Sequence, residues 1–281
     1  MAGSVDQLIR LLDVRPEGND IFSGCPSGSD LPRVFGGHVL GQALATAGCT
    51  VDRGRRPHSL HAYFLRAGAS ERPIDYEVSI LREGRSFSTR EVRARQDAKL
   101  IFTMTASFHL DEPGPEYQCS VPSAPPPHTL ARNSERPEDW PDIYREWTSL
   151  DIRRVPPEFA GAAHCGPEAS RGARSWMRAT APLPEDPLLH ACILACISDL
   201  TLLSVVLVPH DIPPRHDGYR IASLDHSVWF HRPCRVDDWL LYDQTTPSTS
   251  NALGLALGRI LTADGMLAAS VAQEGLIRRE R

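Results

Sequence analysis

The chain has no excess of positive charge. Its 30 lysine and arginine residues stand against 35 aspartate and glutamate residues, which gives a formal net charge of −5 at pH 7. This balance provides no long-range attraction to nucleic acid phosphates or to anionic lipid, so composition indicates neither partner. A local basic patch for an anionic ligand remains compatible with it.

Paired cysteines are also missing. The seven cysteines are odd in number and never occur at CxxC spacing, so neither a disulfide framework nor a metal site is indicated, and no cofactor is expected. The pairs His58 with His61 and His226 with His231 lack accompanying acidic and cysteine ligands, which favours structural roles. A Gly-x-Ser-x-Gly motif is absent too, which removes the usual signature of a serine hydrolase.

The sequence shows no targeting segment that we recognise. The N-terminus has no basic stretch followed by an apolar run, and the chain ends in Arg-Glu-Arg instead of Ser-Lys-Leu, so a cytoplasmic location is expected. One apolar run, 188–208, is long enough to span a bilayer. It contains Asp199 and several hydroxyl residues, has proline at both flanks and lacks a basic flank, so we expect no membrane insertion and a helix buried on all sides.

The elements predict two α+β modules. The first starts with an amphipathic helix at 4–14 capped by Ser4, then a strand at 33–35, a Gly36-Gly37 turn and a helix of small apolar residues. The glycine turn is equally compatible with close packing and with backbone amides that bind a phosphate or a carbonyl. Strands are expected next at 58–65, 74–81, 86–94 and 100–110.

Prolines separate this module from the second one. The segment after Glu112 holds Pro113, Pro115, Pro122, Pro125, Pro126 and Pro127, which disfavour regular structure. We therefore expect an N-terminal module at 1–112, a linker at 113–149, and a second module at 150–281 that carries the proposed catalytic residues. Its expected strands are 150–155, 175–179, 219–231, 239–245, 252–261 and 266–273, with the apolar helix after the first two and a tight turn at Asp264-Gly265.

The two modules look like copies of one another. A shift of 166 positions lays the first set of strands on the second without a gap, with these matches: Phe64 on Phe230, Arg66 on Arg232, Tyr76 on Tyr242 and Arg93 on Arg259. Two such copies would face each other as a pseudo-dimer with clefts near their interface. The two copies differ at positions that bear on function: Pro57 in the first copy is equivalent to Ser223 in the second, and Ser107 is equivalent to Gln273.

The strand at 219–231 carries unusual polar chemistry. Strict alternation places Ser223, Asp225 and Ser227 on one face and apolar residues on the other. A plain alternative is an edge strand whose polar side meets water.

Asp199 is the most informative single residue, because a lone carboxylate in an apolar helix is costly to bury without a partner. Gln273 continues a row of apolar residues at the end of the last strand, and Ser223 supplies a hydroxyl. Together the three groups can hold one water, with Asp199 accepting its proton while Ser223 and Gln273 orient it toward a carbonyl. In the competing interpretation, Asp199 caps local backbone groups and Gln273 ties two strands together.

Several segments resemble the TesB-type acyl-CoA thioesterase II family in order and spacing, among them RVFGGHVLGQAL, HSLHAYFLRAG, LREGRSFSTREVRA, IASLDHSVWFHRP and VAQEG. The resemblance implies a double hotdog fold and hydrolysis of acyl-CoA to free fatty acid and CoA. It also implies catalytic roles for Asp199 of the SDL segment, Ser223 two residues before the DH pair, and Gln273 of the QEG ending. A homo-oligomer is expected.

Two rival functions remain open. An enoyl-CoA hydratase of the hotdog fold is the enzymatic rival, although it would show an Asp-His pair on one loop and helix that is not evident in the sequence. A non-catalytic acyl-CoA binding or sensing protein is the other. Such a protein would keep the acyl tunnel while Asp199, Ser223 or Gln273 were free to change.

Overall fold

The computed structural model describes residues 2–132, 142–160, 172–213 and 218–280. The N-terminal part contains α1 (Val5–Leu11), β1 (Val14–Gly18), β2 (Ile21–Gly24), α2 (Gly36–Cys49), β3 (Arg55–Phe64), β4 (Ile74–Glu83), β5 (Phe87–Gln96) and β6 (Lys99–Leu110). The connection that follows contains the short 3-10 helices η1 (Pro127–Thr129) and η4 (Asp142–Glu146). The C-terminal part contains β7 (Leu150–Arg154), α3 (Pro157–Ala160), β8 (Gly172–Ala179), α4 (Pro187–Thr201), the 3-10 helix η5 (Leu202–His210), β9 (Tyr219–Ser223), β10 (Asp225–Phe230), β11 (Leu240–Ser250), β12 (Leu253–Thr262) and β13 (Leu267–Arg279).

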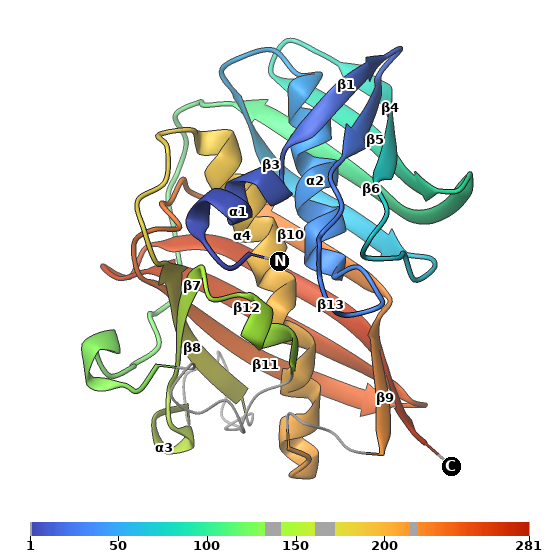
Figure 1. Cartoon of the computed structure of the whole chain (residues 1–281). Coiled ribbons are helices and arrows are strands. Elements are labelled where there is room, and N and C mark those ends of the chain that lie inside the picture. The colour runs from blue at the N-terminus through green and yellow to red at the C-terminus, as the bar shows by residue number, and fades with distance from the viewer. Residues whose placement is uncertain (1, 133–141, 161–171, 214–217, 281) are drawn as a thin grey trace.

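A single antiparallel sheet runs through both halves. Its strand order is β1-β2-β4-β5-β6-β3-β10-β13-β12-β11-β8-β7, and β9 also pairs with β13. Figure 1 shows α2 and α4 side by side at the centre, with the two halves of the sheet curving around them. Each half therefore wraps one long helix, which is the double hotdog arrangement expected from the sequence.

The internal duplication is visible strand by strand. β5 and β12 begin and end 166 positions apart, and β4 and β11 begin 166 apart. Where the halves meet, β3 pairs antiparallel with β10, and His61 lies opposite Ser227, its own equivalent. A pseudo-two-fold axis therefore passes between these two residues. The matched tyrosines also act alike: the Tyr76 hydroxyl donates to Gln42 on α2, and the Tyr242 hydroxyl donates to the Ser198 carbonyl on α4, each over 2.8 Å.

Some predicted elements are wrong. The expected strand at 33–35 is absent except for one isolated bridge from Arg33 to Ala69, and α2 begins at Gly36, so Gly36 and Gly37 form its first turn instead of preceding it. β1 and β2 were not predicted at all. The apolar run at 188–208 is α-helical only to Thr201 and continues as η5.

Other predictions are confirmed. Ser4 caps α1 in a capping box with Gln7, in which each side chain bonds the other's backbone amide. The turn at Asp264-Gly265 joins β12 to β13, with Gly265 at φ +88° and the Thr262 amide bonded to the Met266 carbonyl over 2.9 Å. A left-handed φ suits glycine because it has no Cβ to clash.

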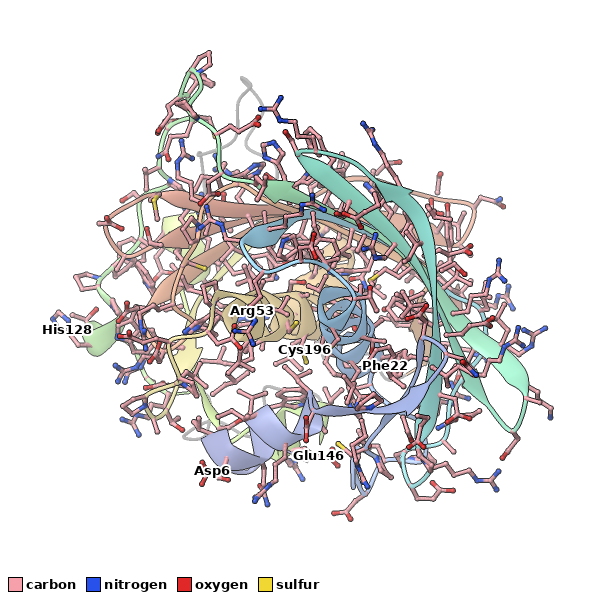
Figure 2. All side chains as sticks on the ribbon, turned by 90° about the horizontal axis from the view of Figure 1, so that it is seen from above. Asp6, Phe22, Arg53, His128, Glu146 and Cys196 are labelled. Carbon is pink, nitrogen blue, oxygen red and sulfur yellow. The ribbon has the colours of Figure 1, made fainter. Side chains whose placement is uncertain are left out.

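Two glycines allow α2 and α4 to pack unusually close. A Cβ added at Gly37 would overlap the Cys196 carbonyl oxygen, and one at Gly41 would lie 3.1 Å from the Cys192 carbonyl oxygen. Both glycines are on α2, one turn apart, so they form a flat strip against α4. Figure 2 shows Cys196 on α4 beside the α2 helix. This contact brings the start of α2 to the end of α4.

The helical stretch Pro187–His210 is long and apolar enough to cross a membrane, and 83% of its most apolar window is buried inside the protein. It packs between α2 and the strands of its own half. The expectation of a helix buried among protein side chains agrees with this environment.

Candidate active site

Asp199 lies near the C-terminal end of α4, where it faces the first turn of α2. The residue is only 7% exposed. Phe35, the N-cap of α2, makes no side-chain capping bond, which leaves the first amides of that helix available to other acceptors. The Gly37 backbone hydrogen-bonds the Asp199 carboxylate, and a Cβ at Gly36 would lie 2.8 Å from Asp199 Oδ2. The carboxylate thus meets the positive end of a helix from the other half.

The structure brings the three predicted residues together. Gln273 Nε2 donates to Asp199 Oδ1 and, over 3.0 Å, to Ser223 Oγ. Ser223 Oγ in turn donates to Asp199 Oδ1 over 3.5 Å. The groups come from β13, α4 and β9, so only the folded protein assembles them. Gln273 lies on the buried face of β13 with Ala269 and Val271, as the alternation of that strand predicted.

The predicted common face of Ser223, Asp225 and Ser227 is wrong. The strand breaks at Leu224, whose amide bonds the Glu274 carbonyl while its carbonyl accepts from the Phe64 amide. This irregularity shifts the alternation by one residue. Ser223 therefore faces Asp199, whereas Ser227 faces the opposite side and contacts His61 Nδ1 over 3.1 Å.

His226 is a neighbour of the site that the sequence did not indicate. Its ring is fully buried, with Nδ1 3.9 Å from Asp199 Oδ1 and Nε2 2.8 Å from Ser198 Oγ. Ser198 Oγ donates to the Ala195 carbonyl, so His226 Nε2 is the donor to Ser198 and Nδ1 is left as an acceptor. Burial lowers the pKa of His226 to about 3, so the pair with Asp199 is not an ion pair at neutral pH. Its position two residues before the core residue Val228 was the available signal.

The Asp199 carboxyl is a stronger base than an ordinary aspartate. Burial raises its pKa to about 6, and this effect outweighs the hydrogen bonds from Gln273, Gly37 and Ser223, which lower it. A carboxylate with this pKa is ionised at neutral pH and accepts a proton more readily than an exposed one. The site therefore combines a carboxylate of raised pKa, a hydroxyl and an amide within hydrogen-bonding distance of one another.

The weaker candidates have structural partners. His58 Nε2 lies 2.8 Å from Ser107 Oγ, and His231 Nε2 lies 2.8 Å from Ser270 Oγ, so neither belongs to the Asp199 cluster. Cys192 and Cys196 are buried on α4, and burial raises the pKa of both thiols. They remain protonated and fill space, as expected from the sequence.

Comparison with protein families gives two matches that together span both halves. A model described as acyl-CoA thioesterase matches residues 148–276, and one described as acyl-CoA thioesterase N-terminal domain matches residues 26–109. Human acyl-coenzyme A thioesterase 8 is 36% identical over 285 residues, which cover 95% of this chain and 88% of the human protein. Acyl-CoA thioesterase 2 of Haemophilus influenzae is 33% identical, with 99% of both chains covered.

Solved structures agree with these sequence matches. The acyl-CoA thioesterase II TesB2 of Mycobacterium marinum superposes with a TM-score of 0.84 at 41% identity, covering 96% of this chain and 97% of that one. A hot dog fold protein of unknown function from Alicyclobacillus acidocaldarius superposes with a TM-score of 0.75 at 20% identity, covering 97% and 98%. The second likeness concerns the fold alone.

Proposed function

This chain belongs to the acyl-CoA thioesterase family, and on that premise we propose that it hydrolyses fatty acyl-CoA to a free fatty acid and CoA, with Asp199 as the general base. The single observation that carries the assignment of residues is the contact of Asp199 with both Ser223 and Gln273. The three groups match what a metal-free attack by water on a thioester requires: a base and two polar groups that orient the nucleophile.

The proposed reaction has two proton transfers. Asp199 takes a proton from water as the water oxygen bonds to the thioester carbon, and the carbonyl oxygen becomes an oxyanion. When this intermediate collapses, the C–S bond breaks and the protonated Asp199 returns its proton to the leaving thiolate, which gives CoA with a free thiol. The raised pKa of Asp199 suits both steps, because the group changes protonation state near neutral pH.

Gln273 is suited to orient the water. Its Nε2 already donates to Asp199 and Ser223, whereas its Oε1 is buried and has no hydrogen-bond partner in the described part of the chain. An amide oxygen in this state accepts a hydrogen bond from a water whose other hydrogen points to Asp199. The Ser223 hydroxyl, bonded to both partners, fixes the relative position of the amide and the carboxylate.

The start of α2 is suited to stabilise the oxyanion. The Gly37 amide of this uncapped first turn already bonds Asp199, so the neighbouring Gly36 amide is the one offered to the oxyanion, and the missing Cβ at Gly36 leaves room next to Asp199 Oδ2. Amides at a helix N-terminus favour negative charge that develops on a carbonyl oxygen. Of the two ligands compatible with the glycines, a carbonyl fits better than a phosphate, because a phosphate would lie against the Asp199 carboxylate.

The test is thiol release from a panel of acyl-CoAs of increasing chain length. We expect the wild type to release CoA and Asp199→Asn to release it at least a thousandfold more slowly, with Gln273→Ala in between. Asp211→Asn makes the same change at an exposed position and should match the wild type. Equal rates for the wild type and Asp199→Asn would reject the mechanism.

The rival functions give different results in the same assay. A sensor would bind acyl-CoA without releasing thiol in the wild type. A hydratase would consume the double bond of an enoyl-CoA while the thioester stays intact, so the enoyl absorbance would fall without thiol release.

A further inference from the structure

The pseudo-two-fold axis that relates the two halves implies a second site equivalent to the first. Positions 223 and 273 have their equivalents in Pro57 and Ser107. The helices exchange roles as well: the start of α2 lies against Asp199 near the end of α4, and the start of α4 lies against Gly48 near the end of α2, where an added Cβ would lie 2.5 Å from Leu188 Cδ2. Glycine, proline and serine thus replace the carboxylate, hydroxyl and amide.

A pocket lined by Pro57 adjoins this second location. It has a volume of about 150 Å³, and the residues that line it include Pro57, His58, Pro187, His190, Ala191 and Phe230. Phe230 is the equivalent of Phe64, whose ring lies beside Gly36 at the catalytic site. The pocket therefore has the placement of an acyl-CoA site but lacks the groups that would cleave a thioester.

His190 gives the pocket an unused hydrogen-bond donor. The residue is 5% exposed, and its Nδ1 accepts the Val236 amide over 3.1 Å, so Nε2 carries the hydrogen. That Nε2 is buried and, in the described part of the chain, has no partner that meets hydrogen-bond geometry, although the Pro184 carbonyl lies nearby; burial lowers the pKa of the ring, so it is neutral at pH 7. A buried donor without a partner is costly, so its presence in a pocket points to a ligand oxygen that accepts from it.

A larger groove continues from the pocket. It has a volume of about 680 Å³ and shares Pro187, His190, Pro233 and Cys234 with the pocket, so His190 lies where the two join. Trp239 and Met266 contribute apolar surface to the groove. Arg56 and Arg232 also line the pocket, and each is in an ion pair, Arg56 with Asp111 and Arg232 with Glu116. A buried donor and two ion pairs at one end and a largely apolar groove at the other suit a molecule with a polar head and a hydrocarbon tail.

We propose that this pocket and groove bind a second acyl ligand, a fatty acyl thioester or a fatty acid, and hold it without cleaving it. The acyl oxygen accepts from His190 Nε2, and the chain lies along Trp239 and Met266. The inference takes the ligand class from the proposed function, while the site rests on the geometry of the pocket.

The experiment counts ligands per chain. Asp199→Asn, which should not consume its ligand, is titrated with decanoyl-CoA and separately with decanoate, both below their micelle concentrations, by calorimetry and equilibrium dialysis. We expect two acyl ligands per chain for at least one of the two probes. If only decanoyl-CoA binds as a second ligand, the site recognises a thioester. If decanoate binds as a second ligand, the site recognises a carboxylate.

Two further variants in the Asp199→Asn background locate the second ligand. Ala191→Phe fills the pocket and should abolish binding of the second ligand. His190→Asn keeps an oxygen to accept the Val236 amide but lacks Nε2, and should weaken the second ligand about fivefold while leaving the first unchanged. A single ligand per chain that Ala191→Phe leaves unchanged would overturn the inference.

The two proposals fail separately. Thiol release is measured in proteins that carry Ala191→Phe or His190→Asn with an intact Asp199, and we expect the wild-type rate, which also shows that both variants fold. Absence of thiol release by the wild type would contradict the proposed function, but it would not change the number of acyl ligands bound per chain. One ligand that Ala191→Phe abolishes would still support the second site.

Discussion

The proposed role of Asp199 as the base predicts how the activity should depend on pH. Its pKa is raised to about 6 by burial, and the carboxylate must be unprotonated to accept a proton from water. We therefore expect kcat/KM to be constant above about pH 7 and to fall about tenfold per pH unit well below 6. The measurement is a pH profile with a soluble acyl-CoA, with His231→Gln as the control because that ring is bonded to Ser270 outside the cluster. A flat profile down to pH 5 would contradict Asp199 as the base.

The same residue should reduce stability at neutral pH. The folded-state pKa is raised above the ordinary value of 3.8, so protonation favours the folded state: this stabilisation is complete below pH 3.8 and is lost as the pH rises through about 6. A shift of this size corresponds to about 3 kcal/mol. We expect Asp199→Asn to raise the free energy of unfolding by about 2 kcal/mol at pH 8 and by less at pH 5. Urea titrations at both pH values provide the check, and a variant less stable than the wild type at pH 8 would refute the expectation.

At the scale of single elements, the packing of α2 on α4 depends on Gly37. A methyl group at this position would overlap a backbone oxygen of α4, which cannot move aside without shifting the helix. We expect Gly37→Ala to lower the free energy of unfolding by about 2 kcal/mol and to reduce kcat, because the Gly37 backbone also bonds Asp199.

Gly48→Ala on the same helix is the matched control. There the atoms nearest to the added methyl all belong to the Leu188 side chain and not to backbone, and alanine favours the helix by about 1 kcal/mol over glycine. Its stability should change by less than half as much as that of Gly37→Ala. Equal losses in the two variants, measured by denaturant unfolding, would show that the contact with the α4 backbone at Gly37 costs no more than the side-chain contact at Gly48.

Strands were predictable from sequence where side chains alternate in burial. The offset of 166 predicted equivalent strands correctly because both halves keep the same strand register around their central helix. Gln273 was found in this way. The face of Ser223 was not, because the break at Leu224 depends on hydrogen bonds to β13 and β3 that local propensity does not encode. β1 was not predicted for a related reason: it contains Pro16 and little apolar alternation, and it forms only by pairing with β2. His226 was missed because its role depends on the neighbour that the fold provides.

At the scale of the whole molecule, the two halves should unfold together. One hydrophobic cluster includes Leu8 and Met104 of the first half and Ile193 and Val271 of the second, and β3 and β10 make the sheet continuous. All five tryptophans lie between residues 140 and 239, so tryptophan fluorescence reports mainly on the second half. We expect its urea transition to coincide with that of far-ultraviolet circular dichroism, which reports both halves. A first transition seen by circular dichroism alone would show independent halves.

The pairing of His61 with Ser227 across the axis has an evolutionary consequence. In an assembly of identical subunits every mutation appears in both copies at once, so one reaction centre cannot be dismantled while its twin is preserved. Fusing the copies into one polypeptide removes that constraint. Residues 48, 57 and 107 can then change without altering the proposed chemistry at 199, 223 and 273.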